Sequence, residues 1–131
     1  MRLEDFLAQN LQTKNFQKGT KIFTKGDQAD LAYFVIEGRI EVFEEYNGEE
    51  ALVATLGPGD ILGEMALLRF DKYTLSSRAA EDAKVHVITP GVLHDEIQKS
   101  SPLVQAILGI LIDRLHDANE TLINLEKVAQ F

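Results

Sequence analysis

The stretch that decides the fold runs from Leu56 to Leu68 and reads LGPGDILGEMALL. Two glycines flank Pro58, and the pair Gly63-Glu64 comes directly before a short apolar run. Such a pair is typical of a loop that opens into a helix, where backbone N–H groups favour an anion and the carboxylate can accept from a sugar hydroxyl. The same dipeptide also occurs where a turn is followed by an acid that only matches the helix dipole, so the pair has to be judged in its context.

The sequence around this stretch has the texture of a β-domain. From Thr20 to Ile88, short β-branched and aromatic runs are separated by glycines, which is typical of a sandwich or barrel. Asn47-Gly48 lies between the apolar-rich runs 40–43 and 51–54 and predicts a β-hairpin. Further turns are predicted at Lys25-Gly26-Asp27 and around Gly38.

Helical spacing is found at both ends of the chain. Leu3, Phe6, Leu7 and Leu11 predict a short amphipathic helix over residues 3–13. After Pro90 the pattern predicts a short helix over 92–98, then a long one that begins at Pro102 with Ser101 as its N-cap.

Apolar residues in the long helix alternate at spacings of three and four, as in a coiled-coil seam. The seam consists of Leu108, Leu111, Leu115, Ala118, Leu122, Leu125 and Ala129. Neighbouring residues broaden the apolar surface, namely Ile107, Ile110, Ile112, Ile123 and Val128. We expect one face to pack on the β-domain and the seam to form a parallel homodimer; the alternative is that the whole stripe packs on its own domain.

Composition narrows the function classes. The chain has 131 residues, no cysteine and a formal net charge of −8, from 13 Lys and Arg against 21 Asp and Glu. One domain, no disulfide and no thiolate metal site are expected. The acidic charge argues against direct binding to nucleic acid. The N-terminus lacks a signal-like apolar region and no run is long enough to span a membrane, so a cytoplasmic protein is expected.

Taken together, the spaced glycines and acids resemble the cyclic nucleotide-binding domain of the catabolite activator and FNR regulator type. The resemblance is carried by residues 16–30, residues 32–43, Gly57-Pro58-Gly59-Asp60 and Gly63-Glu64. It implies an α+β fold that is mainly β. In that fold a single domain over 1–131 contains an N-terminal helix over 3–13, an eight-stranded jelly roll over 16–90 and C-terminal helices over 91–131.

The resemblance also implies a site. In that family Glu64 would take the ribose hydroxyl, while backbone amides at Gly63, Met65 and Ala66 and a downstream arginine would take the cyclic phosphate. The long helix would close on the base, near Asn119 and Thr121, whose simpler role is surface or interface packing. The candidate ligand is therefore cAMP or cGMP, and the candidate pocket consists of Gly63, Glu64, Met65, Ala66, Tyr73 and Thr74.

The arginine is where this chain departs from the pattern. The matching run places Tyr73 at the arginine position, with Thr74 next to it and Arg78 in a strand beyond the pocket. A single phenolic hydroxyl cannot replace the bidentate donors and fixed charge of a guanidinium, so cyclic nucleotide binding is expected to be weak or absent. A rival register makes Arg78-Ala79-Ala80 the phosphate-binding triplet, which lengthens the loop and shortens two strands. Lys72 and Arg69 could supply compensating charge, but we expect both to be solvated; Thr74 and Ser76 could hold a phosphate or face water.

No catalytic pattern is found. His86, His94 and His116 are scattered and are expected at the surface, and Glu44-Glu45 and the other acidic pairs are expected in solvated turns and helix starts. We therefore expect a non-enzyme with no required cofactor and no metal. The prediction is a sensor or regulatory module with a degenerate phosphate-binding cassette that signals through a partner or its own dimer.

Two alternatives remain open. One is a dimerisation or protein-docking domain that binds no ligand. The other is the regulatory domain of a transcription regulator or another effector, without its output domain. We expect either a free-standing sensor-type domain or a fragment of a longer protein.

Overall fold

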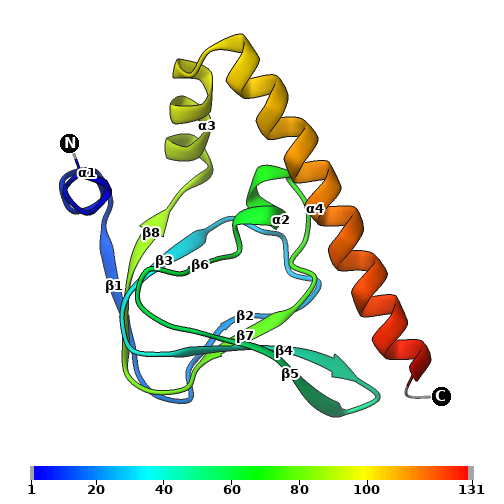
Figure 1. The fold of residues 1–131 in the computed structure, drawn as a ribbon. Coiled ribbons are helices and arrows are strands. Elements are labelled where there is room, and N and C mark those ends of the chain that lie inside the picture. The colour runs from blue at the N-terminus through cyan, green and yellow to red at the C-terminus, as the bar shows by residue number, and fades with distance from the viewer. Residues whose placement is uncertain (1, 130–131) are drawn as a thin grey trace. The chain divides into compact units, whose positions relative to one another are not determined.

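The structure is a computed structural model that describes the backbone of residues 2–129 and the side chains of residues 2–118. Figure 1 shows its helices and strands in chain order. The helices are α1 (Leu3–Asn10), α2 (Glu64–Leu68), α3 (Pro90–Lys99) and α4 (Pro102–Ala129). The strands are β1 (Thr13–Phe16), β2 (Lys21–Phe23), β3 (Ala32–Glu37), β4 (Ile40–Tyr46), β5 (Glu49–Leu56), β6 (Ile61–Leu62), β7 (Ser76–Ala79) and β8 (Ala83–Ile88).

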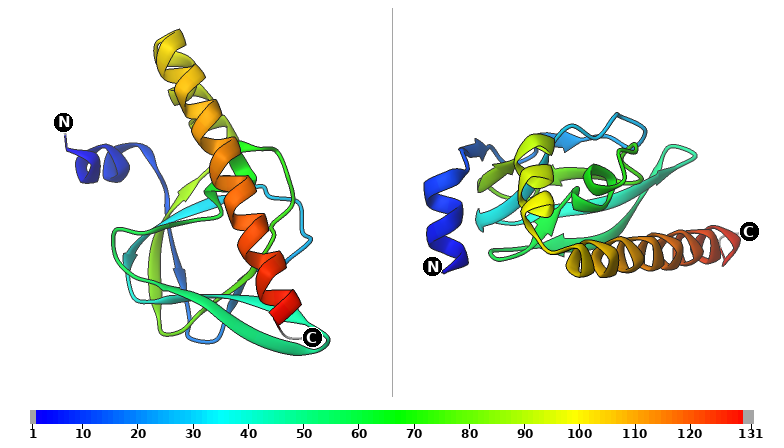
Figure 2. Two further views of the ribbon diagram at one scale, coloured as in Figure 1. Left: turned by 45° about the vertical axis from the view of Figure 1, so that its right-hand side comes forward. Right: turned by 90° about the horizontal axis from the view of Figure 1, so that it is seen from above.

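The chain divides into two compact units, Met1–Val92 and Leu93–Phe131. In the first unit the eight strands form two antiparallel sheets, ordered β1-β8-β3-β6 and β2-β7-β4-β5. This confirms the expected jelly roll with a short N-terminal helix and a long C-terminal helix. Figure 2 shows α1 as a separate short helix beside β1.

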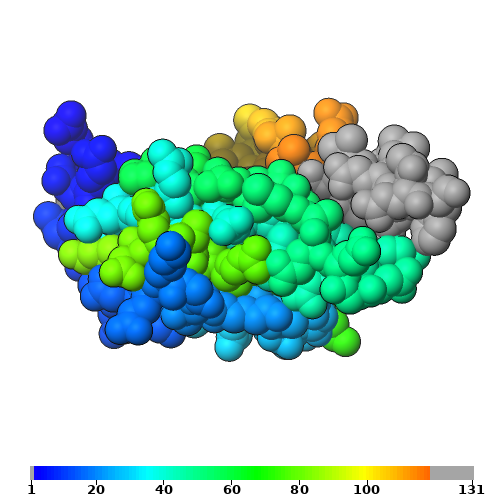
Figure 3. Space-filling model, turned by 90° about the horizontal axis from the view of Figure 1, so that it is seen from below, coloured from blue at the N-terminus to red at the C-terminus, as the bar shows by residue number. Residues whose placement is uncertain are grey.

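The core lies between the two sheets of the first unit. Strand residues alternate between this core and the outer face, so Val35 and Val85 are fully buried while their neighbours Phe34 and Lys84 are half-buried. Ile40, from the second sheet, packs in the same core cluster. The loop between β1 and β2 also contacts the end of β7, since the Gly19 N–H donates to the Ala79 carbonyl at 2.8 Å. Figure 3 shows these two segments next to each other, in blue and yellow-green.

The hairpin predicted from Asn47-Gly48 is confirmed. Both residues have positive φ, 52° and 80°, and they join β4 to β5 with Tyr46 paired to Glu49. A two-residue turn with positive φ matches the natural twist of the flanking strands, and asparagine and glycine adopt it at the lowest cost.

Three predicted boundaries are wrong. The first helix ends at Asn10 rather than residue 13, because Leu11 is extended at φ −114° and Thr13 already pairs with His86 of β8. The roll therefore begins at Thr13 and not at residue 16: ladder hydrogen bonds to β8 override the helical spacing of Leu11. The helix expected over 92–98 runs from Pro90 to Lys99, since proline is tolerated in a first turn.

The second unit ends in the predicted long helix. α4 begins at Pro102, and the Val104 N–H donates to Ser101 Oγ at 3.2 Å, as expected for an N-cap. Among the described side chains, Leu111 and Leu115 of the seam are 48% and 55% exposed. The side chains of Leu122, Leu125 and Ala129, and of Ile123 and Val128, lie outside the described residues.

Candidate functional site

The candidate site is built at Gly63, where β6 ends and α2 begins. Gly63 has φ +81°, a conformation that side-chain-bearing residues rarely adopt. A Cβ added there would lie 3.3 Å from the Leu31 carbonyl oxygen and 3.3 Å from Tyr73 Cε1. Pairing of Leu62 with Tyr33 brings β3 this close. The helix start and the Tyr73 ring therefore meet at a position where the positive φ and the tight surroundings both favour glycine.

Glu64 is the first residue of α2, and its carboxylate is half-buried. Burial raises the pKa of Glu64, while a hydrogen bond from its own backbone N–H acts in the opposite direction. Met65 and Ala66 follow, both half-buried, and buried Leu67 anchors the helix on the roll. The first N–H groups of a helix have no intrahelical acceptor. This short segment thus combines a half-buried carboxylate with backbone donors, a set suited to a polyhydroxylated ligand.

Tyr73 is a buried, neutral residue. Its side chain is 5% exposed, and its ring stacks on Phe23 with centroids 4.0 Å apart and planes 7° apart. The hydroxyl donates to the Leu31 carbonyl, and the Leu31 N–H approaches the same oxygen at 3.4 Å. Burial is the main reason that the pKa of Tyr73 is raised. The phenol thus makes its polar contacts within the fold.

The main chain of Tyr73 is fixed as well. Its N–H donates to the Asp27 carbonyl and its carbonyl accepts from the Gly26 N–H, both at 2.9 Å. Sequence reasoning singled out Tyr73 but missed Phe23 and Leu31, which hold its side chain. Because both lie more than forty positions away in the chain, no local pattern pointed to them.

The hydroxyl residues that follow Tyr73 differ in exposure. Thr74 is exposed, whereas Ser76 is fully buried and its Oγ accepts from the Lys25 N–H at 2.9 Å. The Ser77 hydroxyl is also buried and has no hydrogen-bond partner among the described residues. Of the two hydroxyls proposed for a phosphate, only that of Thr74 therefore reaches solvent.

Arg78 lies in β7 and is held by acidic partners. Its Nη1 is 2.6 Å from Glu50 Oε2 and its Nε is 3.8 Å from Glu41 Oε1. Its guanidinium carbon lies 4.6 Å above the centre of the Phe43 ring. The rival register needs Arg78 in the phosphate-binding loop. The structure instead has it paired in the sheet, in register with Lys21 and Glu41.

Three surface assignments are corrected by the structure. Glu44, expected in a solvated turn, is 7% exposed within β4 and forms an ion pair with Lys25. His86, expected at the surface, is 8% exposed within β8. Arg69, expected to be solvated, is half-buried, while Lys72 is exposed as predicted. In each wrong case a polar residue falls at a strand or helix-end position that packing covers, which local polarity does not reveal.

Two further observations concern the described part of the chain. It holds no cluster of three or more histidine or acidic residues that could bind a metal ion. None of its helices combines the length and apolar character needed to cross a membrane. The side chains of Asn119 and Thr121, considered for contact with a base, lie outside the described residues.

Comparison with known proteins identifies the family. The sequence-family model of the cyclic nucleotide-binding domain matches residues 13–100 of this chain. The chain therefore belongs to this family. It is 28% identical over 116 residues to the cyclic AMP receptor protein of Thermus thermophilus, covering 88% of this chain and 54% of that protein. It is 32% identical over 115 residues to a cAMP-dependent protein kinase regulatory subunit of Yarrowia lipolytica, covering 88% of this chain and 27% of that one.

A solved structure shows the same fold. The EAL enzyme Bd1971, in its cAMP- and cyclic-di-GMP-bound form, superposes with a TM-score of 0.77 at 31% identity. The match covers 84% of this chain and 29% of that enzyme. The chain thus spans about half of the first of these relatives and under a third of the other two. It is a regulatory module of the cyclic nucleotide-binding class.

Proposed function

We propose that this chain is a non-catalytic sensor module that binds a cyclic nucleotide weakly, through a cassette that keeps its ribose-binding half and has lost its phosphate-binding cation. The observation that carries the proposal is the position of Tyr73 against Gly63, with its hydroxyl bonded to Leu31. Relatives named for cAMP support the ligand class.

The ribose half would rest on Glu64. Its carboxylate forms no ion pair with a described residue and accepts only from its own backbone N–H. A sugar hydroxyl could donate to it without displacing a cation. Half-burial would strengthen that hydrogen bond, since the surrounding dielectric is low.

The phosphate-binding half of the cassette is expected to contribute less to affinity. Removing one partner of a desolvated charge pair costs about 2 to 5 kcal/mol, or tens- to thousands-fold in affinity. The exposed Lys72 is one residue away from Tyr73, but an exposed ammonium is screened by solvent and contributes much less than a buried guanidinium. We therefore expect cAMP and cGMP to bind in the high micromolar range or above.

The experiment is calorimetric titration of the wild-type chain, Tyr73→Arg and Glu64→Gln with cAMP and cGMP. Tyr73→Arg is expected to bind more than tenfold tighter than wild type, and Glu64→Gln to bind more weakly. Arg78→Ala is the matched control and should leave affinity unchanged, since Arg78 is paired with Glu50.

Tyr73→Arg also loses the stack on Phe23, so its fold has to be checked by circular dichroism. Thr74→Arg, which adds the charge at the exposed neighbour, gives a second route to the same answer. Sub-micromolar binding of cAMP to the wild-type chain contradicts the proposal. A collapse of affinity on Arg78→Ala would instead support the rival register.

Ligand binding would be signalled through a dimer. Leu111 and Leu115 expose apolar side chains on α4, and a second copy of the helix would cover them. We propose a cytoplasmic homodimer that does not contact DNA directly and that passes its state to a protein partner.

A further inference from the structure

A cavity separate from the candidate site lies on the outer face of the sheet β1-β8-β3-β6, beneath α1. Its volume is about 710 Å³, within the range of roughly 300 to 1,000 Å³ that is common for small-molecule sites. Leu3 and Leu7 of α1 form one wall, and Phe34, Ile36 and His86 form the other. None of the cassette residues Gly63, Glu64 and Tyr73 lines it.

The alternation of the strands explains why this face is open to a ligand. Val35 and Val85 point into the core, so Phe34, Ile36 and His86 lie on the opposite face. Phe34 and His86 are directly paired across β3 and β8 and therefore lie side by side. α1 covers this face only in part, because Leu7 is buried while Leu3 is 60% exposed.

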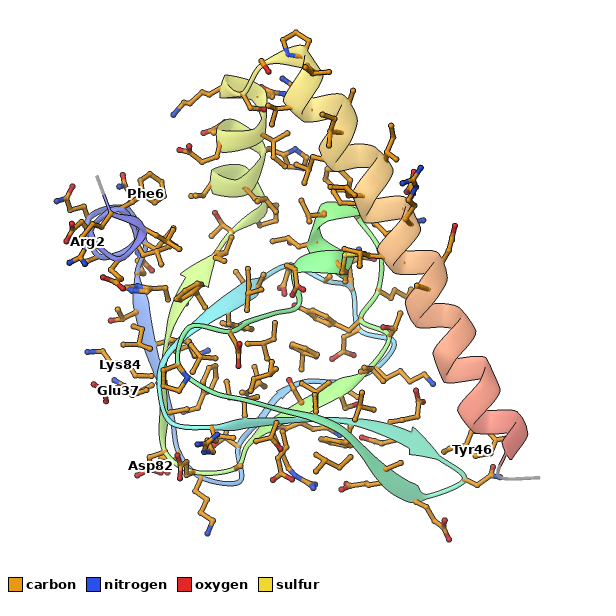
Figure 4. All side chains as sticks on the ribbon, in the orientation of Figure 1. Arg2, Phe6, Glu37, Tyr46, Asp82 and Lys84 are labelled. Carbon is orange, nitrogen blue, oxygen red and sulfur yellow. The ribbon has the colours of Figure 1, made fainter. Side chains whose placement is uncertain are left out.

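His86 is the unusual residue of the cavity. Its side chain is more than nine-tenths buried, yet Nδ1 has no hydrogen-bond partner among the described residues. Burial, and then the charge of Lys84, lower the pKa of His86, so the ring is neutral at physiological pH. Figure 4 labels Lys84 on β8 and Arg2 at the start of α1. A buried nitrogen without a partner is costly, and in the neutral ring either nitrogen can carry the proton, so the imidazole can donate one hydrogen bond to a ligand acceptor.

The charged residues at the rim of the cavity indicate which acceptor group the ligand carries. The Arg2 guanidinium lines the cavity and forms no ion pair or side-chain hydrogen bond within the described part of the chain. Glu4 lines it as well and would repel negative charge on the ligand, so that Arg2 can compensate for no more than one carboxylate. One free cation and one neutral donor suit a single carboxylate, and the Leu3, Leu7, Phe34 and Ile36 walls suit an aliphatic tail.

We propose that this cavity binds an aliphatic monocarboxylate of medium chain length, with its carboxylate between Arg2 and His86 and its tail along the apolar walls. The site is independent of the cyclic nucleotide cassette. A ligand there would tie α1 to the sheet and stabilise the first unit by binding its folded state.

The test is titration of the wild-type chain with octanoate, followed by the ring resonances of His86 in long-range nitrogen–proton spectra and by calorimetry. For a ligand of this size we expect a Kd on the order of 0.1 to 1 mM, with the His86 signals shifting in step. Octanol should bind at least about fivefold more weakly and octylamine should leave His86 unshifted, because neither offers a carboxylate.

Two variants and one control locate the site. Arg2→Gln should weaken octanoate binding about fivefold or more, since Arg2 is exposed and its loss leaves the fold intact. Leu3→Glu should abolish binding by placing a second carboxylate at the rim. Arg114→Gln, the same change at an exposed position of α4, should have no effect.

The proposal is overturned if octanoate at about 5 mM leaves His86 unshifted, or if Arg2→Gln and wild type bind it equally. It is also overturned if octylamine binds as well as octanoate, since that would be unselective apolar adsorption. Shifts of His86 that depend on protein concentration without octanoate would show that a second copy of the chain occupies the cavity. Binding of cAMP is measured separately and leaves this outcome unaffected, so the two proposals can fail independently.

Discussion

Tyr73 shows how one residue can change the ligand chemistry of a site and still support its fold. The phenol ring stacks on Phe23, and its hydroxyl donates a hydrogen bond to the Leu31 carbonyl. The residue thereby stabilises the junction of β3, α2 and the loop before β7. The same contacts leave that position without a positive charge.

At Gly38 the turn between β3 and β4 packs tightly against the backbone of Asp82. A Cβ added there would lie 2.3 Å from the Asp82 carbonyl oxygen, and Gly38 also has φ +87°. Gly38→Ala should lose about 3 kcal/mol or more of unfolding free energy, the sum of the positive-φ cost and the clash. Gly26→Ala is the matched control, with φ +91° and open space around it, and should lose only about 1 kcal/mol. Urea unfolding measures both; equal losses would contradict the clash.

Glu64 predicts a pH dependence of stability. Burial raises its folded-state pKa above the ordinary value of 4.5, so the folded chain holds the proton more tightly than the unfolded chain. The contribution of Glu64 to stability therefore falls as pH rises from 4.5 to the folded-state pKa, and stays low above it. Glu64→Gln should be more stable than wild type at neutral pH, with the gap closing in acid.

Thermal unfolding across this pH range measures the gap. Glu81→Gln, at an exposed position, is the control and should follow the wild type. A gap that is constant with pH would mean that the glutamine changes packing and not ionisation.

At the scale of elements, α4 is the helix whose described apolar side chains are most exposed. Leu103, Val104, Ile107, Ile110, Leu111 and Leu115 are each between 47% and 69% exposed. Apolar surface of this extent on one helix is typical of an interface. The spacing of Leu108, Leu111 and Leu115 predicts that the partner is a second copy of the helix.

The double variant Leu111→Glu/Leu115→Glu should be monomeric if the proposed dimer forms through α4, because two carboxylates would be buried against their symmetry mates. Sedimentation velocity at tens of micromolar measures the change. Ala106→Glu, which helical spacing places on the opposite side of α4, is the control and should remain dimeric. A wild-type chain that sediments as a monomer would show that the seam serves only packing within the chain.

At the scale of the whole molecule, the net charge argues against DNA as a partner. The net charge of −8 repels a phosphate backbone, so the chain should not bind double-stranded DNA with sub-micromolar affinity. Fluorescence anisotropy with a duplex at about 0.1 M salt measures this, with cAMP present and absent. A salt-sensitive, sub-micromolar transition would reveal a basic face and contradict the prediction.

The sequence by itself determined the architecture and the centre of the candidate site. Glycine spacing, the Asn47-Gly48 turn and the helical stripe of α4 predicted a sandwich or barrel between two helical ends, because turns and periodicity are local properties of the chain. The choice of an eight-stranded jelly roll came from the resemblance to the cyclic nucleotide-binding family. Gly63 and Glu64 were located for the same reason.

Only the tertiary structure decided the surroundings of those residues. Strand pairing ended α1 at Asn10, and packing buried His86 and Glu44. The contacts of Tyr73 with Phe23 and Leu31 likewise join segments far apart in sequence. The cavity beneath α1 also depends on which side of β3 and β8 faces the core. Local patterns specify elements and the β4–β5 hairpin, but burial and most strand pairing are set by the whole fold, because strands such as β1 and β8 come from distant parts of the chain.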